Sequence, residues 1–275
     1  MSIIGPSTGQ SDDWEAGASR LNPFSKSAMP ADNPLQPLLR RFQRRVELEP
    51  AAREAILALP YTIRRLEPNR YIVREGDRSD SCALLVSGFA YRHKIVGDGS
   101  RQVVGLQVPG DLLDLNNALL TVADHNVQAL GEAAIALIPK NAILAVAAEH
   151  PEAGRALWLE TLVEASIARE WVANVGRRDS HSRMAHLLCE FALRQEAAGL
   201  GERGRYDLPL TQEQLADALG LTSVHVNRTL KSLESDGLIE RFKRSVTIAD
   251  WDRLRAAGDF NPLYLHLKVE EDASR

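Results

Sequence analysis

Apolar positions recur with a helical period in four segments of the chain. Residues 34–46 and 49–59 predict two short helices, each with its apolar side chains on one face. Residues 151–175 and 180–198 have the same period over a greater length. We therefore expect two short helices near the start of the chain and two long helices in its second half, with a region of another kind between them.

Residues 62–139 lack the helical period and instead hold short runs rich in β-branched and aromatic residues. Glycine, aspartate and proline residues between the runs are typical of turns. Short strands at near-regular spacing predict an antiparallel sandwich or small barrel. The predicted strands are residues 71–73, 83–86, 91–96, 103–108, 127–130 and 134–138.

The long helix predicted from Pro151 is apolar on more than one side. One row of apolar residues with i+4 spacing is formed by Leu159, Val163, Ile167, Trp171 and Val175. A neighbouring row is formed by Trp158, Leu162, Ala165 and Val172. A helix with this much apolar surface is buried on more than one side, so we expect it to contact the same helix of a second copy. The alternative is a core helix inside one monomer, and in both cases Gly176 predicts the end of the helix.

Residues 210–238 predict two short helices joined by a turn that contains glycine. Thr211 and Gln214 have the spacing of a capping box at the start of the first helix. Gly220 can end that helix in a left-handed conformation, and Thr222 can cap the second helix. Two helices joined in this way form the helix-turn-helix unit, which places its second helix in the major groove of DNA.

The second helix and the hairpin predicted after it present the groups that a DNA-binding surface needs. No aspartate or glutamate lies between Thr222 and Lys231 in the sequence, and the hairpin tip over residues 242–244 carries basic side chains. Arginine can bond a guanine edge, valine can contact a thymine methyl group, and hydroxyl or basic groups can bind phosphates. The alternative is a helical hairpin that only packs. The candidate DNA-binding residues are Thr222, Ser223, Val224, His225, Asn227, Arg228, Lys231, Lys243 and Arg244.

Composition and charge leave this interpretation in place. The 275 residues are enough for two domains, and the hydrophobic content of 44% is that of a globular protein. The net charge of −4 argues mildly against a nucleic-acid partner, but the basic residues near the second helix form a local patch. No apolar run approaches the ~20 residues of a membrane span, and the first residues lack a secretory signal. We expect a cytoplasmic protein with no membrane partner.

The two cysteines, Cys82 and Cys189, stand far apart in the sequence. They can supply neither a disulfide framework nor a four-cysteine iron–sulfur cluster. We expect two reduced, semi-buried thiols and no metal site.

Short motifs in both halves of the chain have a recognisable pattern. In the strand-rich region they are Val-Arg-Glu-Gly-Asp at residues 73–77, Leu-Leu-Val-Ser-Gly at 84–88 and Pro-Gly-Asp at 109–111. In the helix-turn-helix they are residues 210–216 and 220–230. With these motifs the chain resembles the Crp–Fnr family of bacterial transcription regulators over residues 62–251.

The resemblance implies an α+β chain with an antiparallel β jelly-roll sensor domain, a long dimerisation helix and a C-terminal winged helix-turn-helix. It implies a sequence-specific regulator that binds double-stranded DNA at a palindromic site as a homodimer through residues 151–177. RNA polymerase would be a further partner of an activator.

The same reading divides the chain into five parts. Residues 1–33 are rich in Ser, Gly, Pro, Asn and Asp and predict a disordered tail. Residues 34–150 form a cyclic-nucleotide-binding-like sensor domain with N-terminal helices, and residues 151–177 form the dimerisation helix. Residues 178–251 form the DNA-binding domain, and residues 252–275 form a helical extension whose apolar side chains are expected to pack on that domain.

The DNA-reading residues of the family map only partly onto this sequence. Arg228 corresponds to the family's recognition-helix arginine, which implies a guanine contact. Val224 stands where the family usually has an acidic reader, and valine cannot accept a hydrogen bond from cytosine. The half-site common in the family is therefore not expected, whereas the amide of Asn227 could read adenine.

The effector site of the family is also altered. Cyclic-nucleotide-binding members hold the ribose with a Gly-Glu pair and the phosphate with an Arg-Ser pair. Asp114 and Leu115 occupy the first two places here, and His125 and Asn126 the second two. A site without arginine and with an added carboxylate does not suit a phosphate, so we predict an effector other than a cyclic nucleotide. Together with Asn116 these residues form either a small polar pocket or loops without a ligand.

Other cofactors and functions have weaker support in the sequence. Haem would require His93 or His125 as an axial ligand, and a lone barrel histidine is more typical of an ordinary side chain. The cluster Asp-Ser-His-Ser at residues 179–182 is typical of a helix cap rather than a catalytic triad, and the sequence has no phosphate-binding loop or nucleophile elbow. A third alternative is a ligand-binding or protein-interaction module whose helix-turn-helix does not bind DNA.

Overall fold

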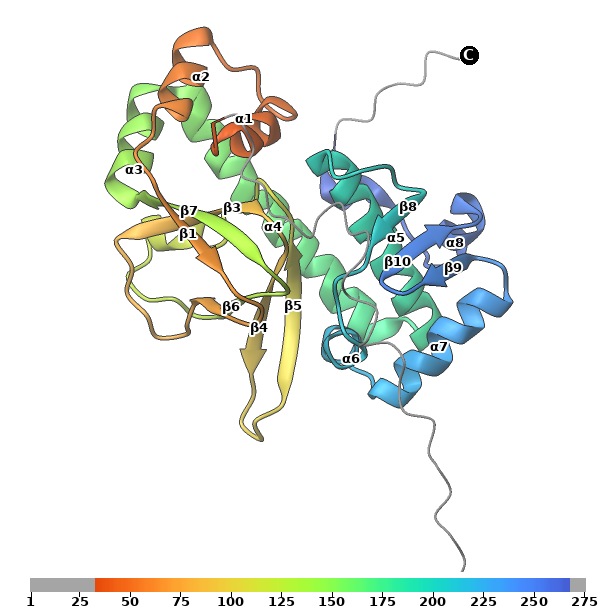
Figure 1. The fold of residues 1–275 in the computed structure, drawn as a ribbon. Coiled ribbons are helices and arrows are strands. Elements are labelled where there is room, and N and C mark those ends of the chain that lie inside the picture. The colour runs from red at the N-terminus through yellow and green to blue at the C-terminus, as the bar shows by residue number, and fades with distance from the viewer. Residues whose placement is uncertain (1–32, 268–275) are drawn as a thin grey trace, which may run out of the picture.

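Residues 33–267 are described by a computed structural model, and residues 1–32 and 268–275 lie outside this description. The predicted N-terminal tail therefore lies almost wholly outside the described residues. Two units of mixed helix and sheet lie on either side of a long helix, α4 (Pro151–Arg177) (Figure 1).

The N-terminal unit is built on two antiparallel sheets, which confirms the predicted fold class. The first sheet has the strand order β1 (Thr62–Leu66), β7 (Ala133–Pro139), β3 (Ser81–Ser87). The second has the order β2 (Tyr71–Val73), β6 (Asn126–Ala129), β4 (Ala90–Ile95), β5 (Arg101–Gln107). Leu85, Val127 and Ile135 belong to one hydrophobic cluster of this sandwich and are completely buried. The apolar pattern did not predict β1, because most of its side chains are exposed.

Helices cover the β1–β7–β3 sheet at one end of this unit. They are α1 (Gln36–Gln43), α2 (Pro50–Leu57), α3 (Lys140–Glu149) and the first turns of α4, with a short 3-10 helix, η1 (Leu115–Ala118), in the β5–β6 connection (Figure 1). The sequence pattern predicted α1, α2 and α4 but not α3. Helices α3 and α4 approach closely at Gly154, where a Cβ atom would lie only 2.8 Å from the carbonyl oxygen of Ala147.

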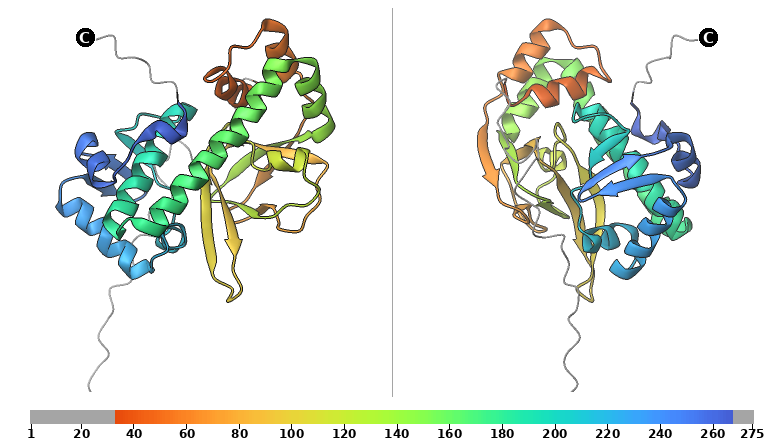
Figure 2. Two further views of the ribbon diagram at one scale, coloured as in Figure 1. Left: turned by 180° about the vertical axis from the view of Figure 1, so that it is seen from behind. Right: turned by 45° about the vertical axis from the view of Figure 1, so that its right-hand side comes forward.

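Helix α4 passes between the two units along most of its length (Figure 2). It begins at Pro151 as predicted and continues to Arg177, the last residue of the predicted segment 151–177 and one residue beyond Gly176. The end is fixed by the extended backbone of Arg178 and by Asp179, whose Oδ1 accepts a hydrogen bond from the amide of Ser182 at 2.9 Å. The cap of the next helix therefore determines where α4 stops.

The C-terminal unit surrounds helix α5 (Ser180–Ala198), which is buried on most of its surface. Its other helices are α6 (Gln212–Leu219), α7 (Ser223–Ser235), α8 (Trp251–Ala257) and the 3-10 helix η2 (Pro262–Leu265). Its sheet has the strand order β8 (Arg205–Asp207), β10 (Ser245–Ile248), β9 (Ile239–Phe242). The sequence analysis missed β8, which pairs with β10 through Tyr206 and Val246.

The segment from α8 to η2 packs on α5, as the apolar residues of this extension predicted. His186 of α5 contacts the rings of Phe260 and Tyr264, with centroid separations of 5.1 and 5.8 Å. Leu254 is completely buried in the same cluster.

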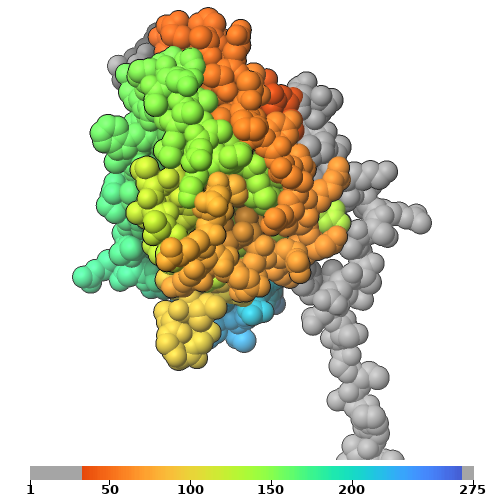
Figure 3. Space-filling view, turned by 90° about the vertical axis from the view of Figure 1, so that its left-hand side faces the viewer, coloured from red at the N-terminus to blue at the C-terminus, as the bar shows by residue number. Residues whose placement is uncertain are grey.

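The two units share a continuous apolar contact. Tyr91, Val103 and Leu106 of the β4–β5 hairpin belong to the same hydrophobic cluster as the helix-turn-helix. Arg101 of β5 also contacts Asp217 of α6 at 2.6 Å. In the space-filling view the yellow hairpin tip projects below the sheets, next to the blue surface of the C-terminal unit (Figure 3). No helix within residues 33–267 has the length and apolarity to cross a membrane.

Candidate functional site

The first helix of the helix-turn-helix begins at the predicted capping box. The side chain of Thr211 accepts a hydrogen bond from the amide of Gln214 at 3.1 Å, and the side chain of Gln214 accepts one from the amide of Thr211 at 2.9 Å. Two amides that have no partner in the helix are thereby satisfied. The local sequence thus fixes where α6 starts.

The turn between α6 and α7 requires a glycine. Gly220 has a φ of +63°, and a Cβ atom there would lie 3.3 Å from a methyl carbon of Val175. Arg183 of α5 donates a hydrogen bond to the carbonyl of Leu219 at 2.8 Å. The end of α6 is therefore held against α4 and α5, and this contact sets the direction in which α7 leaves.

Helix α7 begins at Thr222, whose hydroxyl oxygen accepts a hydrogen bond from the amide of His225 at 3.2 Å. The hydroxyl proton of Thr222 stays available for a phosphate oxygen. Val226, Leu230 and Leu233 are buried against the rest of the unit, as their spacing predicted.

The opposite face of α7 is open to solvent. Val224 is 81% exposed, and Ser223, Arg228 and Lys231 are also exposed, while His225 and Asn227 are half-buried. Within the described residues, Arg228 and Lys231 have no ion-pair partner. The structure therefore brings the predicted reading residues together on one exposed face.

The wing differs slightly from the prediction. Phe242 was expected at the hairpin tip, but it belongs to β9, and the turn consists of Lys243, with a φ of +56°, and Arg244. Lys243 and Arg244 are exposed at this turn. The neighbouring Arg241 instead forms an ion pair with Glu234 of α7 at 2.7 Å, which ties the wing to the helix.

The predicted effector residues lie in the β5–β6 connection and at the start of β6. Oδ1 of Asp114 accepts a hydrogen bond from the amide of Ala83 at 2.6 Å, and Oδ1 of Asn126 accepts one from the amide of Glu75 at 3.1 Å. Leu115 is buried, and Asn116 is half-buried. Asp114 and Asn126 thus hold loop backbone in place, which favours the interpretation as loops over that of a polar pocket.

The two barrel histidines have ordinary packing contacts. His93 is almost completely buried and lies 5.3 Å from the ring of Tyr91, and burial lowers its pKa to about 4. Nδ1 of His125 lies 2.7 Å from the carboxylate of Asp124. These are contacts of ordinary core side chains, and they do not support a role of His93 or His125 as a haem ligand.

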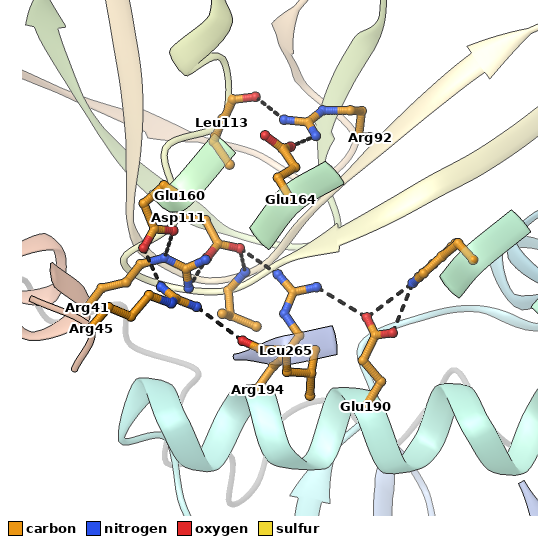
Figure 4. Close-up of polar contacts among 12 residues, drawn as sticks. Arg41, Arg45, Arg92, Asp111, Leu113, Glu160, Glu164, Glu190, Arg194 and Leu265 are labelled. Atoms are coloured by element: carbon orange, nitrogen blue, oxygen red, sulfur yellow. Dashed lines mark hydrogen bonds and ion pairs between the residues drawn. The ribbon is translucent and has the colours of Figure 1, made fainter. Parts of the chain in front are cut away.

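Sequence reasoning missed Arg92, a half-buried arginine beside the predicted effector residues. It extends from β4, donates a hydrogen bond to the carbonyl of Leu113 at 2.7 Å and forms an ion pair with Glu164 of α4 (Figure 4). Burial lowers its pKa to about 10. No local pattern predicts this contact, because strand β4 and helix α4 are far apart in the sequence.

A second network of buried charges joins the two units (Figure 4). Asp111, in the loop after β5, contacts Arg41 of α1 at 2.7 Å and Arg194 of α5 at 2.8 Å. Arg41 and Arg45 both form ion pairs with Glu160 of α4. The two carboxylates and the three guanidinium groups are largely removed from water, so each charge depends on its partners.

The network continues into the C-terminal unit through Glu190. Its carboxylate contacts Arg194 at 3.4 Å, accepts hydrogen bonds from the indole of Trp171 at 3.1 Å and accepts one from the hydroxyl of Tyr264 at 2.8 Å. Polar contacts thereby connect the loop after β5, which holds Asp111, to α4, α5 and η2.

Cys82 and Cys189 are both free and completely buried, rather than semi-buried as expected. Burial raises the pKa of each thiol to about 12. Both sulfurs are therefore protonated at neutral pH and poor nucleophiles. In the described part of the chain, no group of three or more His, Cys, Asp or Glu side chains could hold a metal ion.

Burial of Asp114 predicts a pH dependence of stability. Removal from water raises the pKa of this carboxyl from 3.8 to about 6, so the folded state binds its proton more tightly than the unfolded state does. The contribution of Asp114 to the free energy of unfolding should therefore fall as the pH rises from 4 through 6. In urea titrations, Asp114→Asn should be more stable relative to wild type at pH 7.5 than at pH 4.5, by about 2 kcal/mol.

Asp252→Asn on the exposed face of α8 is the control for this pH experiment. Its stability relative to wild type should be nearly the same at both pH values. An equal difference for Asp114→Asn at both pH values would show that burial does not shift this carboxyl.

A β sandwich, a long helix and a winged helix-turn-helix with an exposed reading face define a DNA-binding regulator with a sensor domain. Residues 63–150 match the cyclic nucleotide-binding domain, and residues 182–257 match the Crp-like helix-turn-helix domain. Both matches fall on the units described above.

Individual relatives align with most of this chain. It is 34% identical over 201 residues to the transcriptional activator protein FnrL of Cereibacter sphaeroides, covering 71% of this chain and 80% of the relative. It is 28% identical over 207 residues to the nitrogen fixation regulation protein FixK of Azorhizobium caulinodans, covering 75% and 82%. The chain belongs to the Crp–Fnr family of transcription regulators and is a DNA-binding regulator.

A solved structure shows the same fold. FixK2 from Bradyrhizobium japonicum superimposes with a TM-score of 0.66 at 24% sequence identity, covering 72% of this chain and 98% of FixK2.

Proposed function

We propose that the chain binds a palindromic DNA site as a homodimer paired through α4, and that each copy reads a half-site with α7. The reading residues are those of the exposed α7 face and the wing turn. Arg228 contacts guanine, Asn227 contacts adenine, and Lys243 and Arg244 contact phosphates. RNA polymerase is a further partner if the chain is an activator, as FnrL is by its name.

The observation that carries this proposal is the presence of two exposed faces with different chemistry on one chain. The first is the face of α7, which exposes basic and polar groups and no carboxylate between Ser223 and Lys231. The second is the apolar row on α4, where Trp158 is 71%, Leu162 53% and Val172 74% exposed. One face suits DNA, and the other suits a copy of itself.

Capture of genomic DNA fragments on the purified protein, followed by sequencing, tests the proposal. The retained fragments should share an inverted repeat whose half-sites are centred about 10 base pairs, or one helical turn, apart. Affinity for that repeat should fall steeply with salt, because phosphate contacts release counterions. A module with an inactive helix-turn-helix would show neither the repeat nor the salt dependence.

A charge on the exposed row of α4 should separate the two copies. Leu162→Glu places a carboxylate at the centre of the proposed contact, where burial without a partner is costly. We expect the wild type to elute as a dimer and the variant as a monomer in size-exclusion chromatography with light scattering, with at least tenfold weaker binding to the repeat.

Leu119→Glu is the matched control, since Leu119 is 81% exposed in the loop after η1 and lies off α4. This variant should stay dimeric. A monomeric wild type, or a dimeric Leu162→Glu protein, would contradict pairing through α4.

We propose an effector other than a cyclic nucleotide. Where cyclic-nucleotide-binding members of the family have a Gly-Glu pair and an Arg-Ser pair, this chain has Asp114 and His125. Arg92, the arginine beside these residues, already forms an ion pair with Glu164.

We also assign the chain no catalytic role, because the Asp179 cluster caps α5. Its place of action is the cytoplasm, where bacterial DNA lies.

A further inference from the structure

A cavity of about 140 Å³ lies where α1 of the sensor unit meets the end of α5 and the chain after η2. Its charged lining consists of Arg40, Arg41, Arg44, Arg45, Arg194 and His266. No aspartate or glutamate of residues 33–267 belongs to the lining. The charged groups of the lining are therefore all basic.

Sequence spacing creates the cluster. The pattern Arg-Arg-Phe-Gln-Arg-Arg over residues 40–45 repeats two arginines at i+4, so that Arg40 and Arg44 share one row at the end of α1. Like charges four residues apart oppose helix formation, whereas basic side chains in the last turn of a helix favour it.

The charges of the lining are only partly balanced. Arg41, Arg45 and Arg194 share three carboxylates, those of Asp111, Glu160 and Glu190. Arg40 and Arg44 are exposed and form no ion pair with a residue of the described part. The five guanidinium groups thus keep an excess of two positive charges.

Arg45 contributes a buried hydrogen-bond donor to the lining of the cavity. Its side chain is only 9% exposed, and its buried Nε has no hydrogen-bond partner among the described residues. A buried donor without a partner is costly, and an oxygen atom of a ligand would satisfy it.

We propose that this cavity binds the phosphate groups of a phosphorylated small molecule. Guanidinium groups match phosphate oxygens with paired hydrogen bonds, and Arg is the side chain best suited to this geometry. With a volume of about 140 Å³, the cavity has room for a phosphate group beside the guanidinium groups.

The site is separate from the DNA-reading surface. Helix α1 lies at the top of the molecule and α7 at the bottom in two views related by a half-turn (Figures 1 and 2). DNA held by α7 therefore does not cover the cavity.

The position of the cavity gives the ligand a regulatory role, an inference that rests on the proposed function. Its lining joins the sensor helix α1 to Arg194 of α5 and to His266. A bound phosphate competes with Asp111 and Glu160 for Arg41 and Arg194, which also connect the two units. Ligand binding therefore changes the contacts that orient the DNA-binding unit, and DNA affinity changes with it.

Calorimetric titration of the full-length protein with inorganic pyrophosphate, at constant ionic strength, tests the site. We expect saturable binding that the double variant Arg40→Gln, Arg44→Gln weakens at least tenfold. Both arginines lie outside the ion-pair network, so the fold should be retained. The double variant Arg64→Gln, Arg65→Gln on exposed positions of β1 is the matched control and should bind like wild type.

Absence of saturable binding, or an equal loss in both double variants, would overturn the proposed site. The regulatory role has its own measurement, the DNA affinity with and without saturating pyrophosphate, and an unchanged affinity would overturn that role. The titration uses no DNA, so it tests phosphate binding in the cavity even if the protein does not bind DNA.

Discussion

Asp111→Ala should lower the free energy of unfolding by about 3 to 5 kcal/mol, because it leaves two buried guanidinium groups without a shared partner. Asp111 is 3% exposed, and besides its contacts with Arg41 and Arg194 it accepts a hydrogen bond from the amide of Val108 at 2.9 Å. Urea unfolding followed by circular dichroism measures the loss.

The control for Asp111 is a surface ion pair of the same unit. Glu75 contacts Lys94 at 2.6 Å, and both side chains are more than 40% exposed. Glu75→Ala should cost less than about 1 kcal/mol, because water already solvates both charges. Similar losses for the two variants would mean that burial does not make the Asp111 network important.

A compensated variant separates the buried charge from the loss of packing. Asp111→Leu combined with Arg194→Met removes one charge of each sign and fills similar volumes. Buried ion pairs can be replaced by apolar residues at little cost, so this pair should recover much of the stability lost in Asp111→Ala. No recovery would indicate that the hydrogen bond to Val108, rather than the ion pair, holds the loop.

Arg228→Ala should weaken binding to the palindromic site by about 2 to 6 kcal/mol, since each of two half-sites loses roughly 1 to 3 kcal/mol of base readout. Arg228 is exposed and bound to no other described residue, so its removal leaves no buried group unpaired. Binding to random DNA should change much less. Fluorescence anisotropy with the captured site and with a scrambled duplex measures both.

Two further variants distinguish base readout from charge. Arg228→Lys keeps the charge but loses the paired geometry, so it should also relax the preference at one base pair. Lys231→Ala should weaken binding to all duplexes alike and reduce the salt slope by about 2, or about 1 for each half-site. Equal loss on specific and scrambled DNA for Arg228→Ala would assign Arg228 to a phosphate.

The stability experiments test the buried charges between the two units, and the DNA-binding experiments test the exposed face of α7. The Asp111 network connects the loop after β5 to α1, α4 and α5, whereas the exposed face of α7 is the proposed DNA-binding surface. If the network orients the DNA-binding unit, Asp111→Leu, Arg194→Met should fold well and yet alter DNA affinity. That combination would locate the coupling between sensor and DNA reading in these contacts.

Local pattern was enough to predict the helix-turn-helix. Its helix ends depend on the capping box, on Gly220 and on the caps of α5 and α7. Each cap involves residues only three or four positions apart, so the local sequence is enough to predict it. Short runs rich in β-branched and aromatic residues, separated by turn residues, likewise predicted most strands of the sandwich. The exposed row of α4 was also visible as a second apolar stripe.

Tertiary structure alone decided how the two units are joined. Arg194 and Asp111 are separated by 83 positions, and no local spacing brings them together. The same holds for Arg92 with Glu164, for β8, whose partner strand lies well after it, and for the arginine cavity between α1 and α5. The sequence determined what depends on hydrogen bonds and periodicity within a few residues, whereas contacts between distant segments form only when the packed cores bring those segments side by side.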